Sequence, residues 1–312
     1  MPLPVAEFRH GGLRILGASL AGEESFLVVP ELNLAFDVGR APREVIAVDH
    51  VFLTHGHMDH AAGIAYYFAQ RMFLDNDPGH LYMPEGLVEP VQELLRIWGD
   101  IDGHEPPAYL HPAVPGQDLQ IRRDLIVRTF RVNHPCRRNH RGIIDSLGFA
   151  AIEVRRKLKD EYHDLPGPKL VELKKQGVEI TRRIELPLVA YCGDTAPGDF
   201  LDLGFVKNAQ VLLLECTFVE ADHLERARAG YHFHLSHLRE VLPGLNNERI
   251  VLTHLSRRSI FAEALRQLQR EIGSEADERV TFLMDARHRR RRSSRRESPG
   301  NAGNDKVDKI EI

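Results

Sequence analysis

The stretch Thr54-His55-Gly56-His57-Met58-Asp59-His60 decides how this chain folds. It follows the short apolar run 51–53, which has the composition of a buried strand, and it leads into residues 59–72, which have the apolar spacing of a helix. Four potential metal ligands therefore lie between a strand and a helix: His55, His57, Asp59 and His60. Neutral imidazole and carboxylate groups suit zinc. We expect the first two to face one metal ion and the last two to reach a second.

One such stretch cannot fill two metal sites, so further ligands are expected at the ends of other strands. Three candidates follow predicted strands: His134 after residues 130–132, Asp194 after residues 189–193, and His254 after residues 250–253. An aspartate between two metal ions can bridge the ~3.5–4 Å that separates them in two-metal sites, and we expect Asp194 to do so. His140 competes with His134 for the ligand role, and we favour His134 because it directly follows its strand.

Strands and helices recur along both halves of the chain. Strands are predicted at residues 13–16, 25–29, 34–38, 51–53, 125–132, 147–154, 188–192, 211–215, 250–253 and 280–283. Helices are predicted at residues 59–72, around 88–98, and at 235–242 and 261–271. A β-rich first half with helices, followed by a second half of the same kind, predicts an α/β fold in which two mixed sheets pack face to face with external helices.

Charge is unevenly distributed along the chain. We expect residues 1–285 to form one domain, within which residues 155–186 make a basic, less apolar excursion that contains Gly167-Pro168. Residues 286–312 form a tail with nine basic and four acidic side chains, a net charge of +5. Residues 1–285 carry 32 basic and 41 acidic side chains, a net charge of −9, which argues against a broad nucleic-acid surface. The tail fits either RNA or acidic-lipid binding, or a solvated and disordered end.

Composition also indicates the class of protein. The 312-residue chain has no apolar run near the ~20 residues that cross a bilayer. Its first seven residues contain neither the basic nor the apolar segment of a secretory signal. Three scattered cysteines with no C-x-x-C pair suit a reducing compartment: Cys136, Cys192 and Cys216. We therefore expect a cytoplasmic protein with no membrane partner.

The order of the candidate ligands resembles the metallo-β-lactamase superfamily, whose fold is an αβ/βα sandwich. The matching features are the His-x-His-x-Asp-His run, the lone His134, Gly193-Asp194-Thr195 and Thr253-His254. Three further motifs resemble the Glu-x-Thr-Phe strand end, the His-bearing turn and the His-Phe-Ser-x-Arg-Tyr ending of the ribonuclease Z branch: Glu215-Cys216-Thr217-Phe218, Tyr231-His232-Phe233-His234 and His254-Leu255-Ser256-Arg257-Arg258-Ser259. Residues 32–40 and the run from 158–162 through 177–181 resemble the short, plant-type members, and the resemblance covers about residues 13–285.

Ribonuclease Z removes the 3′ trailer of precursor tRNA, so the resemblance implies a phosphodiesterase that binds precursor tRNA. It implies two Zn²⁺ ions, or Mn²⁺ or another divalent metal in their place. The implied ligands are His55, His57 and His134 for one ion, and Asp59, His60 and His254 for the other, with Asp194 shared. In the family the water between the metals is the nucleophile, and Asp59 also orients or deprotonates it. His232, steadied by Glu215, is implied to protonate the departing 3′ oxygen, and the family is usually homodimeric.

Some of these assignments have alternatives in the sequence. His234 and His237 compete with His232 for the role of the acid. Arg258, close to His254, either contacts a substrate phosphate or is merely solvated.

The chain also departs from the family pattern. Ser259 stands where the family usually has Tyr, and residues 155–186 are shorter than the arm with which bacterial ribonuclease Z grips the tRNA elbow. One alternative function is hydrolysis of a small molecule such as a cyclic nucleotide, a lactone or a thioester. Glu215 with His232 argues against ester chemistry, which has less need of a leaving-group acid. The other alternative is a non-catalytic, metal-bearing RNA-binding protein.

Overall fold

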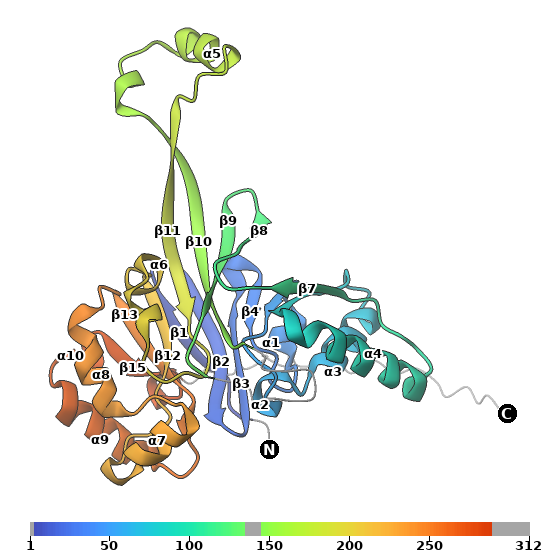
Figure 1. The fold of residues 1–312 in the computed structure, drawn as a ribbon, viewed down its shortest axis with the longest axis vertical. Helices are drawn as coiled ribbons and strands as arrows, with labels where there is room; N and C mark the ends of the chain where they lie inside the picture. The colour runs from blue at the N-terminus through green and yellow to red at the C-terminus, as the bar shows by residue number, and fades with distance from the viewer. Residues whose placement is uncertain (1–2, 135–144, 289–312) are drawn as a thin grey trace, which may run out of the picture.

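The computed structural model describes residues 3–134 and 145–288, which form two β-sheets packed face to face with helices outside them (Figure 1). Within the described residues, the first sheet has eight strands, in the order β1-β2-β3-β4-β5-β6-β7 with β14 paired to β2. Their bounds are β1 Ala6–His10, β2 Leu13–Ala21, β3 Glu24–Val29, β4 Leu34–Phe36, β5 His50–Phe52, β6 His80–Pro84, β7 Tyr109–Ala113 and β14 Leu255–Ser256. The predicted α/β sandwich is confirmed.

The second sheet has seven strands in the described part of the chain, in the order β15-β13-β12-β11-β10-β9-β8. Their bounds are β8 Asp118–Arg122, β9 Leu125–Arg131, β10 Leu147–Leu158, β11 Thr181–Tyr191, β12 Val211–Glu215, β13 Arg249–Thr253 and β15 Val280–Phe282. Both sheets are mixed, since β1 to β4 and β8 to β11 pair antiparallel whereas β4 to β7 and β11 to β15 pair parallel.

Helices cover the outer faces of the sheets (Figure 1). Their bounds are α1 Arg43–Ile46, α2 Met58–Ala61, α3 Ile64–Phe73, α4 Val88–Asp102, α5 Gly167–Lys175, α6 Gly204–Lys207, α7 Leu224–Gly230, α8 Leu235–Val241, α9 Phe261–Ile272 and α10 Glu275–Glu278. Successive side chains of a strand point to opposite faces of its sheet. Phe52 accordingly packs between the two sheets, while its neighbour Val51 packs in the layer beneath α3 and α4.

The predicted helix 59–72 is interrupted at Gly63. The chain instead forms α2 and α3, because Gly63 packs directly on residues 39–41, which lie between β4 and α1. A Cβ atom built on Gly63 would lie 2.4 Å from the backbone nitrogen of Ala41, and Gly63 N donates to Gly39 O at 2.8 Å. This close approach holds the junction of α2 and α3 against the segment that follows β4.

The strands that precede the predicted ligands end at one edge of the sandwich. In the first sheet, β5 leads into Thr54 and the histidines after it. In the second sheet, the parallel strands β11, β12 and β13 end at the same side. A hydrogen bond of 3.0 Å from Leu147 N, at the start of β10, to Thr54 O joins the two sheets there. The fold therefore gathers residues that are distant in sequence at this edge.

Strands β10 and β11 continue beyond the sandwich as a two-stranded arm with α5 near its tip (Figure 1). The sequence predicted strands only at residues 147–154 and 188–192, but the pairing extends to Leu158 and Thr181. The outer part was not predicted because backbone hydrogen bonds hold it together without a buried apolar face. Residues 155–186, predicted as a basic excursion, form this arm.

The predicted basic tail lies mostly outside the described residues, since residues 289–312 are not described. Of the tail's first residues, Arg287 pairs with Asp285 at 2.9 Å, and His288 Nδ1 donates to Leu283 O at 3.1 Å. None of the helices in residues 3–134 and 145–288 combines the length and the apolar character that a membrane crossing requires.

Candidate metal centre

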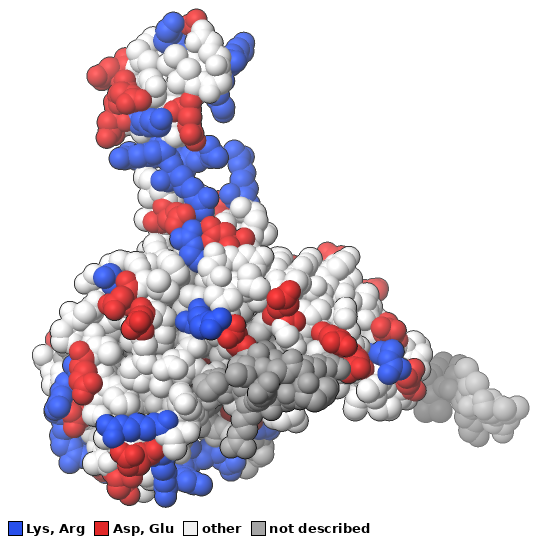
Figure 2. All heavy atoms as spheres, in the orientation of Figure 1, with Lys and Arg blue, Asp and Glu red and all other residues white. Residues whose placement is uncertain are grey.

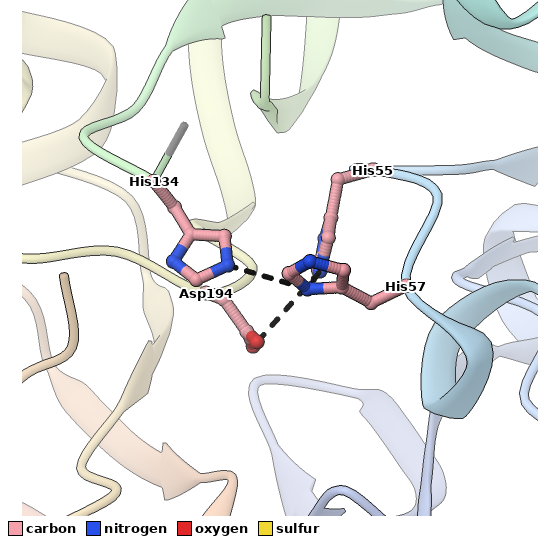
Figure 3. A group of neighbouring side chains, drawn as sticks. All are labelled: His55, His57, His134 and Asp194. Atoms are coloured by element: carbon pink, nitrogen blue, oxygen red, sulfur yellow. Dashed lines mark hydrogen bonds and ion pairs between the residues drawn. The ribbon is translucent and has the colours of Figure 1, made fainter. Parts of the chain in front are cut away.

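The seven predicted metal ligands lie together at the edge where the strands end. Their ligand atoms fall into two groups, within each of which all atoms are within 4.8 Å of one another: His55, His57, His134 and Asp194, and then Asp59, His60 and His254. In the first group, His57 Nδ1 is 2.9 Å from His55 Nε2 and 3.4 Å from His134 Nε2 (Figure 3). His140, the alternative to His134, lies outside the described residues.

Asp194 stands between the two groups. Its Oδ2 atom is 3.7 Å from His55 Nε2 in the first group and 3.2 Å from His254 Nε2 in the second. Its Oδ1 atom is 3.3 Å from His60 Nε2, also in the second group. A carboxylate shared by two metal ions would need this position.

Two buried polar atoms at the centre make no hydrogen bond to any described residue: His60 Nε2 and Asp194 Oδ1. Buried polar atoms are nearly always hydrogen-bonded, so an unsatisfied imidazole nitrogen beside an unsatisfied carboxylate oxygen requires an explanation. A divalent cation bound by both atoms provides one. Imidazole and carboxylate groups together are also the ligand chemistry of zinc and related cations. The residues therefore fit a metal centre.

The protonation states of the first group and of the two carboxylates favour metal binding as well. Burial lowers the pKa of His60, but Asp194 and Asp37 outweigh burial and raise that pKa, so a bound cation would have to deprotonate this ring. Burial lowers the pKa of the three imidazoles of the first group, so they are neutral at pH 7: His55, His57 and His134. Burial opposes the charge of Asp194, but His254 and His60 outweigh it and hold the pKa of that carboxyl well below its usual range. Burial also opposes ionisation of Asp59, yet the hydrogen bond from His254 and the charge of His60 lower its pKa to about 2. Neutral imidazoles and ionised carboxylates are the forms that bind metals.

Asp37, a carboxylate not predicted from the sequence as a site residue, orients two of the ligands. It follows β4, is fully buried, and has the left-handed φ of 57° that aspartate tolerates better than most residues. Its Oδ2 atom accepts from His60 Nδ1 at 2.7 Å, and its Oδ1 atom accepts from Thr54 N at 2.8 Å and Thr54 Oγ1 at 2.9 Å. Because that hydroxyl donates to Asp37, it accepts from His55 Nδ1 at 2.9 Å. Both histidines are left with Nε2 free to bind a metal.

Glu215 is bound in the same way at the end of β12. It is fully buried, and its Oε1 atom accepts from His232 Nδ1 at 2.8 Å and from Thr195 N at 2.6 Å. Its Oε2 atom accepts from the hydroxyl of Thr217, and that hydroxyl accepts in turn from His254 Nδ1 at 3.0 Å. One carboxylate thus orients both a predicted metal ligand and the predicted acid.

His232 lies beside the metal ligands and is partly exposed, with 18% of its side chain accessible. Its ring nitrogen also falls within 4.8 Å of ligand atoms of Asp194 and His254. Burial lowers the pKa of His232, but the charge and hydrogen bond of Glu215 outweigh burial and raise that pKa to about 9. The imidazole is therefore protonated at pH 7, as a general acid must be.

The two rivals of His232, at the start of α8 and within it, are engaged elsewhere. His234 caps α8 by accepting from Ser236 N at 3.1 Å, and its Nε2 atom is 2.9 Å from Glu220 O. His237 Nδ1 accepts from His234 N at 3.2 Å. Both histidines have a structural explanation, and neither belongs to a ligand group among the described residues.

A pocket of about 380 Å³ lies over the centre. Its lining consists of Ala21, Gly22, His57, Asp59, Asp194, Thr217, Phe218, His232, His254, Ser256 and Arg258. Arg258 is therefore placed where it can meet a bound anion, whereas Ser259 donates to Glu220 Oε2 at 2.9 Å. A larger pocket of about 610 Å³, between α4 and β7, contains none of the predicted ligands.

Known proteins are similar to this chain in sequence and in fold. The family model of the metallo-beta-lactamase superfamily matches residues 30–73. The chain is 34% identical over 255 residues to tRNase Z TRZ1 of Arabidopsis thaliana, covering 81% of this chain and 88% of that protein. It is 33% identical over 274 residues to tRNase Z TRZ2, chloroplastic, of the same plant, covering 87% of this chain and 75% of that protein. The chain belongs to the tRNase Z, or ribonuclease Z, family.

Membership of the tRNase Z family confirms the resemblance drawn from the motifs, including its plant-type character. It identifies the chain as a metal-dependent hydrolase of the metallo-β-lactamase superfamily. A solved structure with the same fold is the metallo-beta-lactamase fold protein YhfI from Bacillus subtilis. That protein is 16% identical, with a TM-score of 0.58, and the match covers 85% of this chain and 93% of YhfI.

Proposed function

We propose that the chain is a zinc-dependent endonuclease that removes the 3′ trailer from precursor tRNA. The observation that supports this most is the Glu215–His232 pair, 2.8 Å apart and beside the ligand groups. A ribose 3′ oxygen is a poor leaving group and needs a proton, whereas an ester or thioester has less need of one. The plant relatives, which are named tRNase Z, support the same substrate.

Two divalent cations, which we expect to be zinc, fit the two ligand groups with Asp194 shared. When bound, such ions supply the Lewis acidity that makes water a nucleophile at neutral pH, and they offset the negative charge of the phosphate. Asp59 is ionised at neutral pH, and its Oδ2 atom is held by a hydrogen bond of 2.7 Å from Gly22 N. We assign Asp59 the orientation of the attacking water and the acceptance of its proton.

His232 acts on the leaving group. Glu215 accepts from Nδ1 of the imidazolium, so the Nε2 proton is the one available to the substrate. As the bond between phosphorus and the ribose 3′ oxygen breaks, His232 donates this proton to the oxygen. The products are a tRNA with a 3′-hydroxyl and a trailer with a 5′-phosphate. Arg258, in the lining of the same pocket, is our candidate for a contact to the phosphate.

The arm is our candidate for RNA contact outside the metal centre. Its strands carry exposed basic side chains, which Figure 2 shows gathered below the tip: Arg155, Arg156, Lys157, Arg182 and Arg183. Strand β10 begins beside Thr54 and runs for 12 residues. At ~3.3 Å per residue it ends roughly 40 Å from the metal centre. RNA held by the arm is therefore far from the cleaved bond, and the arm contributes to binding rather than to chemistry.

We also infer a homodimer. The helices α3 and α4, with Leu74 directly after α3, leave large apolar side chains exposed: Tyr66, Phe73, Leu74, Leu94, Ile97, Trp98 and Ile101. Apolar surfaces of this kind mark interaction sites. A second copy is the proposed occupant, because the resemblance to the ribonuclease Z family implies a homodimer. The cytoplasmic location stays a prediction from the sequence.

A comparison of three substrates tests the reaction class. Bis(p-nitrophenyl) phosphate, a lactone and a thioester would each be incubated with the metal-loaded protein, with and without a chelator. We expect hydrolysis of the phosphodiester that the chelator abolishes. Faster hydrolysis of the lactone or the thioester would replace the nuclease with a small-molecule hydrolase, and no turnover of any substrate, tRNA included, would favour a non-catalytic RNA-binding protein.

A further inference from the structure

Tyr191 connects the two sheets at the metal centre. It is the last residue of β11 in the second sheet, and its hydroxyl donates to Asp37 Oδ2, in the first sheet, at 2.8 Å. Both side chains are buried, with 1% of Tyr191 and none of Asp37 exposed. Asp194, the carboxylate between the two ligand groups, follows Tyr191 by three residues. The hydroxyl thus ties the segment that carries Asp194 to the carboxylate behind the histidines.

Asp37 depends on such donors. A buried carboxylate is costly unless its oxygens accept hydrogen bonds. Thr54 supplies both donors of Oδ1, while Oδ2 accepts from His60 at 2.7 Å and from Tyr191 at 2.8 Å and also lies 3.1 Å from the Thr54 hydroxyl. Without the Tyr191 hydroxyl, Asp37 loses the one of these donors that comes from the second sheet. The orientation of His60 then rests on contacts within the first sheet.

A second contact shows that the sheets meet tightly at this point. Gly193, two residues after Tyr191, has a left-handed φ of 60° and lies against Thr54. A Cβ atom on Gly193 would be 2.8 Å from Thr54 Cγ2, closer than real Cβ contacts. Thr54 is the residue through which Asp37 reaches His55. The position of the second sheet therefore affects both histidines that Asp37 orients.

We propose that Tyr191 is a positioning residue that couples the two metal sites. Tyr191 holds Asp37, which in turn accepts a hydrogen bond from His60, a ligand of the second group. Asp37 also accepts from the Thr54 hydroxyl, which orients His55, a ligand of the first group. One hydroxyl thus influences the affinity of both ions. This inference rests on the two-metal centre proposed above, and it concerns how tightly the metals bind rather than which substrate is cleaved.

The competing interpretation is that Tyr191 only packs the core. Its ring lies 5.4 Å from that of Phe36 between the sheets, which is an ordinary core contact. The substitution Tyr191→Phe keeps this ring and removes the hydroxyl alone. Tyr67→Phe is the matched control, because Tyr67 is also fully buried and its hydroxyl donates to Val48 O at 2.9 Å, away from the ligands.

The test is a metal titration of the metal-stripped full-length chain and its variants. Zn²⁺ affinity would be measured by competition with a chromophoric chelator, and coordination by the absorption of bound Co²⁺. Loss of a residue that orients metal ligands typically weakens binding 10–100-fold. We expect Tyr191→Phe to weaken both ions by about this factor and to change the Co²⁺ spectrum, and Tyr67→Phe to bind both ions like the wild type.

Affinities of Tyr191→Phe within twofold of the wild type would overturn the inference, as would an equal loss in Tyr67→Phe. A wild-type chain that binds only one ion would overturn the two-metal centre and the coupling with it. Thr54→Val checks the route, because it removes the hydroxyl that serves His55 but leaves the bond from His60 to Asp37. It should weaken one of the two binding steps more than the other, and equal weakening of both would contradict the separate routes.

Discussion

Asp37 and Glu215 are bound in the same way: each accepts one hydrogen bond directly from a histidine and another from a threonine hydroxyl that serves a second histidine. They differ in what those histidines do. Both histidines of Asp37 are candidate metal ligands, whereas Glu215 serves one ligand, His254, and the candidate acid His232. Variants of the two carboxylates should therefore affect different steps.

The first prediction separates the acid from the metal centre. His232→Ala should keep both metal ions, because seven other side chains supply the two ligand groups. Its rate on precursor tRNA should fall by about 10²–10⁴, the usual contribution of general acid–base catalysis. On bis(p-nitrophenyl) phosphate the fall should be much smaller, because p-nitrophenolate leaves without a proton. Kinetics on both substrates and metal analysis of the variant provide the check.

Two results would count against the acid role of His232. Equal rate losses on both substrates would mean that the side chain does not act on the leaving group. Loss of a metal ion would mean that His232 is itself a ligand, as its closeness to Asp194 and His254 allows. The matched control is His237→Ala, since that ring lies nearby in α8 and its Nδ1 atom accepts from His234 N at the start of the helix.

The second prediction is a pH dependence. The charge of Glu215 outweighs burial and raises the pKa of His232 to about 9, and bound cations nearby would lower that pKa. The acid is present below its pKa and lost above it, so cleavage of precursor tRNA should decline as the pH rises toward 9. Glu215→Gln removes the carboxylate charge, so the decline should move to lower pH. An unshifted profile in Glu215→Gln would disprove the link between the two residues.

The third prediction concerns the shared carboxylate. The metal-loaded wild type should hold two divalent ions per chain, and Asp194→Ala should bind metal more weakly and show no turnover, because Asp194 contacts ligands of both groups. Elemental analysis with single-turnover assays measures both effects. At most one tightly held ion in fully active protein would remove the basis for a bridging role.

The fourth prediction tests the arm. Replacing Arg155, Arg156 and Arg182 with alanine should raise the KM for precursor tRNA and flatten its salt dependence, because such side chains bind phosphates by charge. Hydrolysis of bis(p-nitrophenyl) phosphate should be unchanged, since the arm is distant from the centre. The control replaces three arginines of α8 and α9 with similar exposure, Arg239, Arg266 and Arg270. A similar KM increase in the control would show that total charge, rather than the arm, matters.

The ligands could be predicted from sequence because a local rule identifies them. Each ligand, or the short segment that contains it, follows an apolar run whose composition predicts a buried strand. The ends of these strands meet at one edge of the sandwich. Asp37 obeys the same rule, since it follows the apolar run 34–36, and this signal was available. Its role could not be predicted, because it depends on His60 and on Tyr191, which is 154 residues away.

Several of the strands that were not predicted share a physical reason, although β6, which was also not predicted, is mostly buried and lies inside its sheet. β7 contains Pro112 and lies at the end of its sheet, where a missing backbone N–H is tolerated. β1 and β8 are also end strands, and the outer halves of β10 and β11 are held by backbone pairing alone. Hydrophobic patterns in a sequence indicate which faces of a strand are buried. A strand with an exposed face, or with no buried face at all, therefore gives a weak signal.

The most direct test of the proposed function is cleavage of a precursor tRNA transcript that carries a 3′ trailer. The metal-loaded full-length protein would be incubated with it, with and without chelator, and both new ends would be mapped. We predict one cut at the start of the trailer, with a 3′-hydroxyl on the tRNA, a 5′-phosphate on the trailer and no product when the metal is removed. An intact transcript, in a preparation that hydrolyses bis(p-nitrophenyl) phosphate at a normal rate, would contradict the assignment of precursor tRNA as the substrate.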